Sequence, residues 1–298
     1  MVIFDFNDAI VIEDKKYGGS SEKEAIKFNG LQWMLKYPSI VKEAWYDLSY
    51  RNNSISEYLS CKIIESIGFE VQSVLLGTKN GKYVVACRDI EEQYNAKLIP
   101  LSDFKVSKDR WLNKYDFNRY DVFLRCIANQ EYLHQEFIIQ NYWNTFVIDA
   151  LLGNYDRNLT NIGLLVNKDG NGSMSPVYDC ASTLAPSLAD NRLAEMVSNK
   201  RKLDSYIEIK PKMSVMLPIA GKYTKLTYLD FIDNTEGSIY LKNALENVLG
   251  RISLGSIESI INNLNIISGV RKEFYYEFIK RRKEVILDYA YSKFVRVK

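Results

Sequence analysis

The stretch that decides the fold, residues 151–183, reads LLGNYDRNLTNIGLLVNKDGNGSMSPVYDCAST. An apolar helical pattern ends at Gly153, and a polar loop then leads to a short apolar segment. Asp156 and Asn161 lie in this loop, and an Asp followed after four residues by an Asn is the catalytic-loop spacing of phosphotransferases. There the Asp orients or deprotonates the attacking hydroxyl, and the Asn binds Mg²⁺. The spacing alone is a weak signal, because Asp and Asn in loops are commonly turn formers.

The residues that follow this loop strengthen the interpretation. IGLLV and SPVYD have the pattern of two strands, and the turn NKDGNG between them centres on Gly170. Asn161 and Asp179 each lie nine residues from that glycine. Residues equidistant from a hairpin turn face each other in an antiparallel ladder, so we expect the two side chains to meet at the end where Asp156 lies. Carboxylate and amide oxygens are suited to Mg²⁺, with phosphates completing its shell.

The first ninety or so residues have strand patterns. AIKF and LQWMLK are joined by Asn29-Gly30, and VQSVLLGT and YVVACRDI by Asn80-Gly81, which predicts two hairpins with two-residue turns. Between them the apolar spacing changes to three and four, which predicts a helix from about Ser54 to Ile67 that Gly68 ends. We therefore expect a small β-rich lobe over residues 1–91.

From about Glu91 onward the character is helical. Residues 115–130 and 136–153 have helical periodicity, and further helices are expected near residues 240–249, 257–264 and 270–294. A second, helical lobe over residues 92–298 follows, which makes the fold class α+β. The run Lys280-Arg281-Arg282-Lys283 is interpreted as a solvated helix face, with a partner or nucleic-acid patch as the alternative.

A phosphoryl-transfer site also needs backbone donors and a cation for the nucleotide. Gly18-Gly19-Ser20-Ser21 lies between two strand patterns, as a phosphate-covering loop would, although two glycines also suit a plain turn. Lys36 closes a predicted strand and is either a solvated edge residue or a phosphate ligand paired with a helix glutamate. Glu57 and Glu65 are the candidates for that glutamate.

Composition excludes several classes of function. The 298 residues carry 39 Lys and Arg against 37 Asp and Glu, and this near balance gives no strong drive toward nucleic acid or an anionic membrane. Four cysteines lie far apart without a CxxC pair, and His134 is the one histidine, so the spacing of these residues gives little support for a zinc site. We expect the cysteines to be buried thiols in a reducing cytoplasm. We find neither an export signal nor an apolar run long enough for a membrane span, and expect a soluble cytoplasmic protein.

The chain resembles HipA-like kinases, most closely the short form of the family. The resemblance covers nearly the whole chain and is carried by SEYLSCKIIESIGFEVQ, LLGTKNGKYVVACRDI, FVIDALLGNYDRNLTNIGLL and SPVYDCASTLAP. Its most specific part is LLGNYDR-x3-N followed by PVYDCAS. It implies a bilobal protein-kinase-like fold and Mg²⁺-dependent transfer of the ATP γ-phosphate to serine or threonine of a protein substrate.

The resemblance also implies roles at matching positions. Asp156 would be the base, with Arg157 beside it in the catalytic set, and Asn161 and Asp179 would bind Mg²⁺. Asp179 would occupy the place of the aspartate in the DFG sequence of ordinary kinases.

On the nucleotide side, the resemblance implies that Lys36 holds the α- and β-phosphates and that Glu57 orients Lys36. The hinge that binds adenine would be formed by Ala86, Cys87, Arg88, Asp89 and Ile90. Family members can phosphorylate a serine near their own phosphate-binding loop, which makes Ser20 and Ser21 candidates, with Ser54 and Ser56 behind them.

Two departures from the family pattern stand out. Many members carry a histidine after the catalytic Asp-Arg pair, where this chain has Asn158, and the glycine-rich loop is sparse. The chain has no room for the extra N-terminal subdomain of full-length HipA proteins, so we expect any inhibitor, such as a HipB-like antitoxin, to be a separate polypeptide. Within the kinase interpretation, a toxin restrained by such a partner is favoured over an exported effector kinase. The alternatives to a protein kinase are a small-molecule phosphotransferase and a pseudokinase that acts as a binding module.

Overall fold

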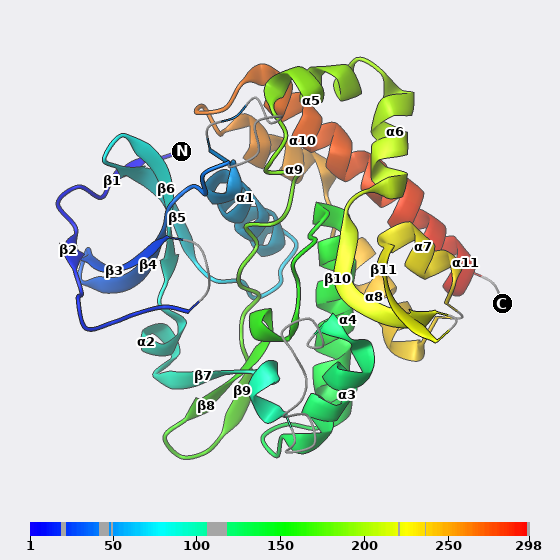
Figure 1. Cartoon of the computed structure of the whole chain (residues 1–298), viewed down its shortest axis with the longest axis horizontal. Coiled ribbons are helices and arrows are strands. Elements are labelled where there is room, and N and C mark those ends of the chain that lie inside the picture. The colour runs from blue at the N-terminus through cyan, green and yellow to red at the C-terminus, as the bar shows by residue number, and fades with distance from the viewer. Residues whose placement is uncertain are drawn as a thin grey trace.

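The computed structural model describes residues 1–18, 22–41, 48, 50–105, 118–219, 221–235 and 237–296. Its amino-terminal part is a six-stranded sheet in the order β1-β5-β6-β4-β3-β2, in which β1 runs parallel to β5 and the other neighbours are antiparallel (Figure 1). The strands are β1 Phe4–Asp5, β2 Ile10–Val11, β3 Lys23–Phe28, β4 Leu31–Lys36, β5 Val74–Lys79 and β6 Lys82–Arg88.

Both predicted hairpins of this sheet are confirmed. Asn29 and Gly30 join β3 to β4 with φ angles of 50° and 78°, and Asn80 and Gly81 join β5 to β6 with φ angles of 51° and 73°. Positive φ at both central residues is the two-residue turn whose twist matches the flanking strands, and Asn-Gly adopts it at little cost.

Helix α1, Asn53–Ser66, lies beside this sheet and contacts β5 and β6 (Figure 1). It agrees with the predicted helix to within one residue at each end, and Gly68 follows with a φ of 74°. The buried apolar face of α1, which includes Leu59 and Ile63, joins a core that continues into the helical part of the chain. Since α1 packs on both parts, its polar residues can reach a site between them.

A three-stranded sheet in the order β7-β8-β9 follows, made of β7 Ala96–Pro100, β8 Gly163–Asn167 and β9 Gly172–Met174. The prediction of a second strand at SPVYD is wrong, because β9 ends before it and the pairing of Leu165 with Ser173 shifts the register. Past Pro176, which has no N–H to donate, Val177 instead pairs with the chain near α1 through hydrogen bonds with Glu70 and Gln72. Asn161 and Asp179 are therefore not partners across a ladder.

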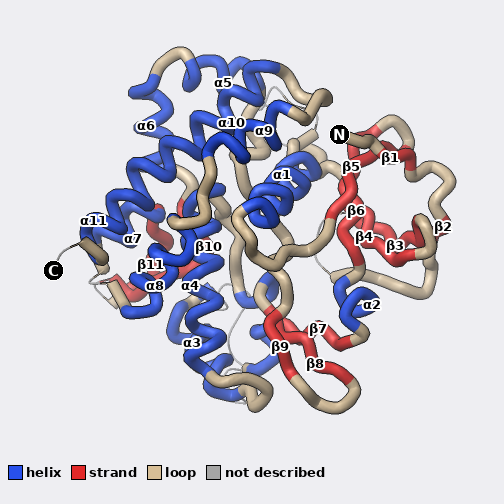
Figure 2. Tube along the Cα trace, turned by 180° about the vertical axis from the view of Figure 1, so that it is seen from behind, coloured by secondary structure: helices blue, strands red, loops and turns tan. Residues whose placement is uncertain are grey.

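The rest of the described chain is mainly helical (Figure 2). The predicted long helices are confirmed as α3 Tyr120–Asn129, α4 Gln135–Leu152, α8 Ile239–Leu249, α9 Leu254–Asn262 and α10 Gly269–Arg282, the last continuing through a π-helical turn at Lys283–Asp288 into α11 Tyr289–Phe294. Besides β7, the elements that the sequence did not predict include α2 Ile90–Tyr94, α5 Asp190–Val197, α6 Lys200–Ile209, α7 Tyr228–Asp233 and the hairpin of β10 Lys212–Ile219 and β11 Lys222–Thr227.

The basic run near the end of α10 is not a solvated face. Arg282 is fully buried, its Nε donates to the backbone oxygen of Ala150 at 2.6 Å, and its guanidinium lies over the ring of Tyr228. Arg281 pairs with Asp204 at 2.8 Å. Arg281 and Arg282 therefore anchor α10 to α6 and to the carboxyl end of α4, whereas Lys280 and Lys283 remain partly exposed. Among the helices that the structure describes, none has the length and apolar character needed to cross a membrane.

Candidate active site

A pocket of about 410 Å³ opens where the amino-terminal sheet, α2, β7 and the loop after α4 meet. From the amino-terminal part it is lined by Lys15, Lys16, Tyr17, Gly18, Lys23, Met34, Lys36 and Gln72. From the connecting segment and the later chain it is lined by Asp89, Ile90, Glu91, Leu98, Pro100, Thr160, Asn161, Tyr178 and Asp179. Cations, carboxylates and apolar side chains thus line one cavity, as the triphosphate and the base of a nucleotide require.

The centre of the pocket is a three-residue ion cluster. The Nζ of Lys36, at the end of β4, lies 2.9 Å from Oε2 of Glu57 on α1 and 2.9 Å from Oδ1 of Asp179. The other oxygen of Glu57 accepts a hydrogen bond from the backbone N–H of Cys180 at 2.9 Å. Glu65, the other helix candidate, is exposed and pairs with Lys62 instead. The cluster therefore joins the sheet, α1 and the segment around Asp179.

The charges of this cluster stabilise one another. Burial by itself would lower the pKa of Lys36, but the neighbouring Asp179 and Glu57 carboxylates raise it well above its ordinary value. The Lys36 ammonium in turn lowers the pKa of Asp179. Both groups are ionised at neutral pH, so a cation for phosphates and an anion for a metal face the same cavity.

The catalytic loop begins at Gly153, whose φ of 69° ends α4 in the left-handed conformation. Asp156 is exposed, and its backbone oxygen accepts a hydrogen bond from Nδ2 of Asn161 at 2.9 Å. This bond assigns the amide nitrogen of Asn161 to the loop and leaves its Oδ1 as the atom able to ligate a cation. Thr160 donates to that Oδ1 at 3.1 Å, and Thr160 and Asn161 both line the pocket.

Arg157 is buried beneath this loop and lies outside the residues that line the pocket. Its Nε and Nη2 donate to the two carboxylate oxygens of Asp149 at 2.8 and 3.2 Å. Its Nη1 donates to the backbone oxygens of Asn161 at 3.0 Å and Tyr178 at 2.5 Å. The guanidinium of Arg157 therefore links the backbone at Asn161 to the backbone at Tyr178, the residue before Asp179. The sequence analysis did not single out Asp149, since an acid within an apolar helix has no local signal of its partner.

The segment predicted as a hinge divides between two environments. Ala86, Cys87 and Arg88 belong to β6 and do not line the pocket, whereas Asp89 and Ile90 do. Asp89 begins α2 by accepting a hydrogen bond from the N–H of Glu92 at 2.8 Å.

Two residues that the sequence analysis missed close this end of the pocket. Tyr17 donates its hydroxyl proton to Asp89 at 2.6 Å, and Lys15 lies 2.5 Å from the same carboxylate. Burial raises the pKa of Asp89, but the hydrogen bonds from Lys15 and Tyr17 outweigh it and lower that pKa. The segment before the glycine pair is thereby attached to the start of α2.

Of the predicted phosphate-covering loop, Gly18 lines the pocket, and Gly19, Ser20 and Ser21 lie outside the described residues. Ser54 and Ser56, the second pair of phosphorylation candidates, are both buried in α1.

Comparison with known proteins identifies the family. The model of the HipA-like C-terminal domain matches residues 16–238, which include every residue that lines the pocket except Lys15. The chain belongs to this family. The HipA-like match therefore extends from the segment before the glycine pair, through Lys36 and the loop after α4, past α7 to the residue before α8.

The chain is also a homologue of a serine/threonine protein kinase. It is 32% identical over 303 residues to the serine/threonine-protein kinase CtkA of Helicobacter pylori, and the match covers 100% of this chain and 90% of the relative. The crystal structure of H. pylori CtkA, described as a proinflammatory kinase, superposes with a TM-score of 0.89 at 29% identity, covering 100% of this chain and 99% of that one. This HipA-like chain thus has the CtkA fold along its whole length.

A more distant likeness shows the fold alone. HipA of Shewanella oneidensis, solved with HipB and operator DNA as a toxin-antitoxin system, superposes with a TM-score of 0.56 at 13% identity, covering 93% of this chain and 66% of that one. The β-rich amino-terminal sheet and the helical carboxyl-terminal part are therefore the α+β, protein-kinase-like arrangement that the sequence analysis expected.

Proposed function

We propose that this protein transfers the γ-phosphate of ATP to serine or threonine residues of protein substrates, with Mg²⁺ bound by Asn161 and Asp179. The observation that carries the proposal is the position of Lys36, 2.9 Å from both Glu57 and Asp179 in a pocket that Asn161 also lines. A lysine oriented by a helix glutamate and placed beside a metal-binding aspartate is the arrangement that protein kinases use. The kinase homologue CtkA supports the same interpretation.

The residues present fit a magnesium ion. Asp179 supplies a carboxylate and Asn161 an amide oxygen, which are hard oxygen ligands of the kind that Mg²⁺ takes together with phosphates. When bound, the metal would neutralise charge that develops on the transferred phosphoryl group. Asp179 has a φ of 58°, a left-handed conformation that an Asp tolerates and that turns its side chain toward Lys36.

In this proposal the other residues position the reactants. Lys36 binds the α- and β-phosphates, Glu57 orients Lys36, and Gly18 with its neighbours Gly19, Ser20 and Ser21 covers the phosphates. Asp156, exposed at the start of the loop, orients the acceptor hydroxyl and takes its proton. Arg157 acts indirectly, by holding the backbone on which the metal ligands stand.

The adenine would lie between Met34 and Leu98, beside Asp89 and Ile90. This places the hinge at the junction of residues 1–91 with residues 92–298, which we propose as the two lobes of the kinase. Ala86, Cys87 and Arg88 support the hinge as the end of β6 and do not contact the base.

We further propose that the protein phosphorylates itself and that a separate polypeptide restrains it. Ser20 and Ser21, next to the pocket residue Gly18, are the favoured acceptors, because Ser54 and Ser56 are buried. The likeness to HipA, solved with HipB, supports a toxin restrained by a HipB-like antitoxin, and the description of CtkA as a proinflammatory kinase favours the alternative of an exported effector. Both proposals share the same phosphotransfer chemistry.

The decisive test is incubation of purified protein with radiolabelled ATP and Mg²⁺, alone and with a cell lysate, followed by gel autoradiography. Labelled protein bands are expected with the wild type and none with Asp156→Ala, which should still fold because the side chain is exposed. Bands that persist in a correctly folded Asp156→Ala protein would overturn the assignment of the base. ATP consumption without labelled protein would indicate a small-molecule phosphotransferase, and nucleotide binding without turnover a pseudokinase.

A further inference from the structure

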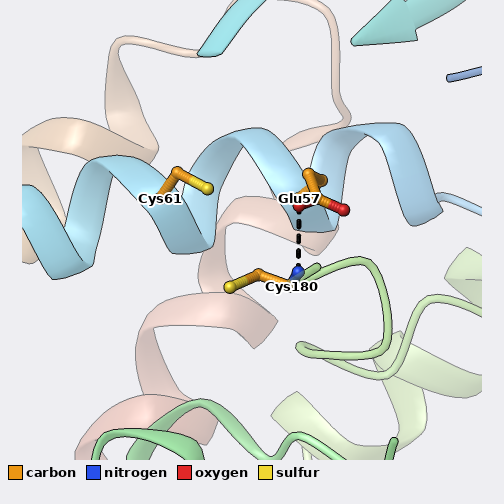
Figure 3. A group of neighbouring side chains, drawn as sticks. All are labelled: Glu57, Cys61 and Cys180. Atoms are coloured by element: carbon orange, nitrogen blue, oxygen red, sulfur yellow. Dashed lines mark hydrogen bonds between the residues drawn. The ribbon is translucent and has the colours of Figure 1, made fainter. Parts of the chain in front are cut away.

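Two cysteine thiols lie beside Glu57, the partner of Lys36, and neither lines the pocket. Cys61 follows Glu57 by one turn on the same side of α1, and Cys180 lies on the segment that approaches α1 after Asp179 (Figure 3). The two sulfur atoms and a carboxylate oxygen of Glu57 all lie within 4.8 Å of one another. The thiol of Cys61 also hydrogen-bonds to Cys180, and this bond raises its pKa, so little of it is thiolate at neutral pH and its reaction with peroxide should be slow.

We propose that Cys61 and Cys180 form an oxidisable dithiol and that a peroxide converts it into a disulfide that restrains the kinase. The reaction is balanced with hydrogen peroxide as the oxidant: two S–H bonds and the O–O bond break, one S–S bond forms, and two water molecules leave. A disulfide requires sulfur atoms about 2.05 Å apart, so the two side chains must approach each other. The segment after Asp179 already contacts α1 through the backbone bond between Cys180 and Glu57.

The surroundings favour a disulfide over a metal ion at the same place. Glu57 would have to be the third ligand, but one of its oxygens binds Lys36 and the other accepts from the Cys180 N–H. Two cations also flank the thiols, because Arg157 Nη2 lies 3.7 Å from the sulfur of Cys180 and Lys36 lies beyond Glu57. Disulfide formation leaves Glu57 in place and brings no further positive charge.

Access to the thiols would follow the nucleotide cycle. Both cysteines are buried, but Cys180 is the direct neighbour of the pocket residue Asp179. A movement that separates α1 from the catalytic segment would admit peroxide, and bound nucleotide, which holds these parts together, would slow oxidation. This step rests on the proposed function, whereas the proximity of the thiols does not.

The expected consequence is a slower kinase. The bond would join α1, which packs on the amino-terminal sheet, to the segment that carries Asp179. On the proposed function, we infer that these parts separate for nucleotide exchange, so we expect a rate at least about tenfold lower after oxidation, with full recovery in a thiol reductant.

The test begins with the wild-type protein and hydrogen peroxide, with and without ATP and Mg²⁺. Peptide mapping without reduction should show a Cys61–Cys180 crosslink, formed more slowly with nucleotide, and an intact mass lower by two hydrogen atoms. Labelling from radiolabelled ATP and the affinity for ATP are measured before oxidation, after it, and after dithiothreitol. Cys61→Ala should keep its activity and resist inactivation, while the matched control Cys126→Ala, which removes a buried thiol from α3, should stay sensitive.

The mapping decides the proposal even where Cys61→Ala does not fold. Loss of activity without the crosslink, or a crosslink that changes neither rate nor ATP affinity, would overturn it. Tight binding of Zn²⁺ to the reduced protein that is lost in Cys61→Ala would overturn it in favour of a metal site. A protein that forms the crosslink, changes its ATP affinity with it and labels no substrate would refute the proposed function alone.

Discussion

Arg157 and Asp149 form a bidentate ion pair between the catalytic loop and the helix before it, with Nε–Oδ2 and Nη2–Oδ1 distances of 2.8 and 3.2 Å. Both side chains are almost completely buried. Asp149 also accepts a hydrogen bond from the side chain of Asn154 at 2.8 Å. Because Nη1 of Arg157 binds the backbone at Asn161 and Tyr178, the pair connects the end of α4 to the two positions proposed to bind metal, Asn161 and the neighbour of Tyr178, Asp179.

The first prediction separates the stability of this pair from its role in activity. Arg157→Met leaves the Asp149 carboxylate buried without its cation, which should lower the free energy of unfolding by about 3–5 kcal/mol. Adding Asp149→Leu removes the stranded charge and should recover most of that loss, as followed by urea unfolding. Kinase activity should stay low in the folded double variant, because the hydrogen bonds from Arg157 to the backbone oxygens of Asn161 and Tyr178 are still missing. Recovery of activity together with stability would show that Arg157 does not position the site.

The second prediction concerns the metal. Asp179→Ala should abolish the Mg²⁺ dependence of ATP binding, because the carboxylate ligand is gone while Lys36 remains to bind phosphates. Isothermal titration with and without Mg²⁺ measures this directly. Asp169→Ala is the matched control, since Asp169 is an exposed carboxylate in the β8–β9 turn. An unchanged response of the Asp179→Ala protein to Mg²⁺ would contradict the assignment.

The third prediction is a pH dependence. Lys36 lowers the pKa of Asp179, so the stabilisation that this carboxylate contributes is present above its ordinary value and is lost only as pH falls through its lower pKa in the folded protein. The difference in unfolding free energy between wild type and Asp179→Asn should therefore stay constant from about pH 7 to about pH 5 and shrink below about pH 4. Urea unfolding across this range provides the measurement. A difference that already shrinks between pH 7 and pH 5 would show that Asp179 is not the partner of Lys36.

The features predicted correctly from the sequence are those with local signals. The Asn-Gly turns, the periodicity of α1 and α4, and the glycine at the end of α4 each depend on neighbours in the chain. The loop with Asp156 and Asn161 follows from the same helix end, and of these two residues Asn161 lines the pocket and Asp156 does not.

The features that were missed depend on contacts between distant residues. The strand expected at SPVYD does not form, because the backbone N–H of Val177 donates to the backbone oxygen of Glu70 near α1. The sequence of the segment itself contains no signal of this distant partner. The choice of Glu57 over Glu65, and the approach of Cys61 to Cys180, likewise appear only once α1 packs against the segment after Asp179. The prediction for Arg282 was wrong because a basic run in the sequence resembles a solvated face and does not reveal a buried partner. In the structure that partner is the backbone oxygen of Ala150, which accepts a hydrogen bond from Arg282.

The last prediction concerns Gly153, where the catalytic loop begins. Its φ of 69° disfavours any residue with a Cβ, and a Cβ there would lie 2.8 Å from Cζ of the buried ring of Phe278. Gly153→Ala should therefore lower the unfolding free energy by about 2–4 kcal/mol, as strain and overpacking add. Gly170→Ala is the matched control, because Gly170 has a φ of 82° but a Cβ added to it would meet nothing within 4 Å, and it should lose only about 1 kcal/mol. Gly153→Ala should also reduce activity, because the loop that carries Asp156 begins at the displaced end of α4. Gly170→Ala should not reduce activity. Equal losses of stability in the two variants would show that the ring of Phe278 moves aside without lowering the unfolding free energy. Only the backbone conformation would then matter at the start of the loop.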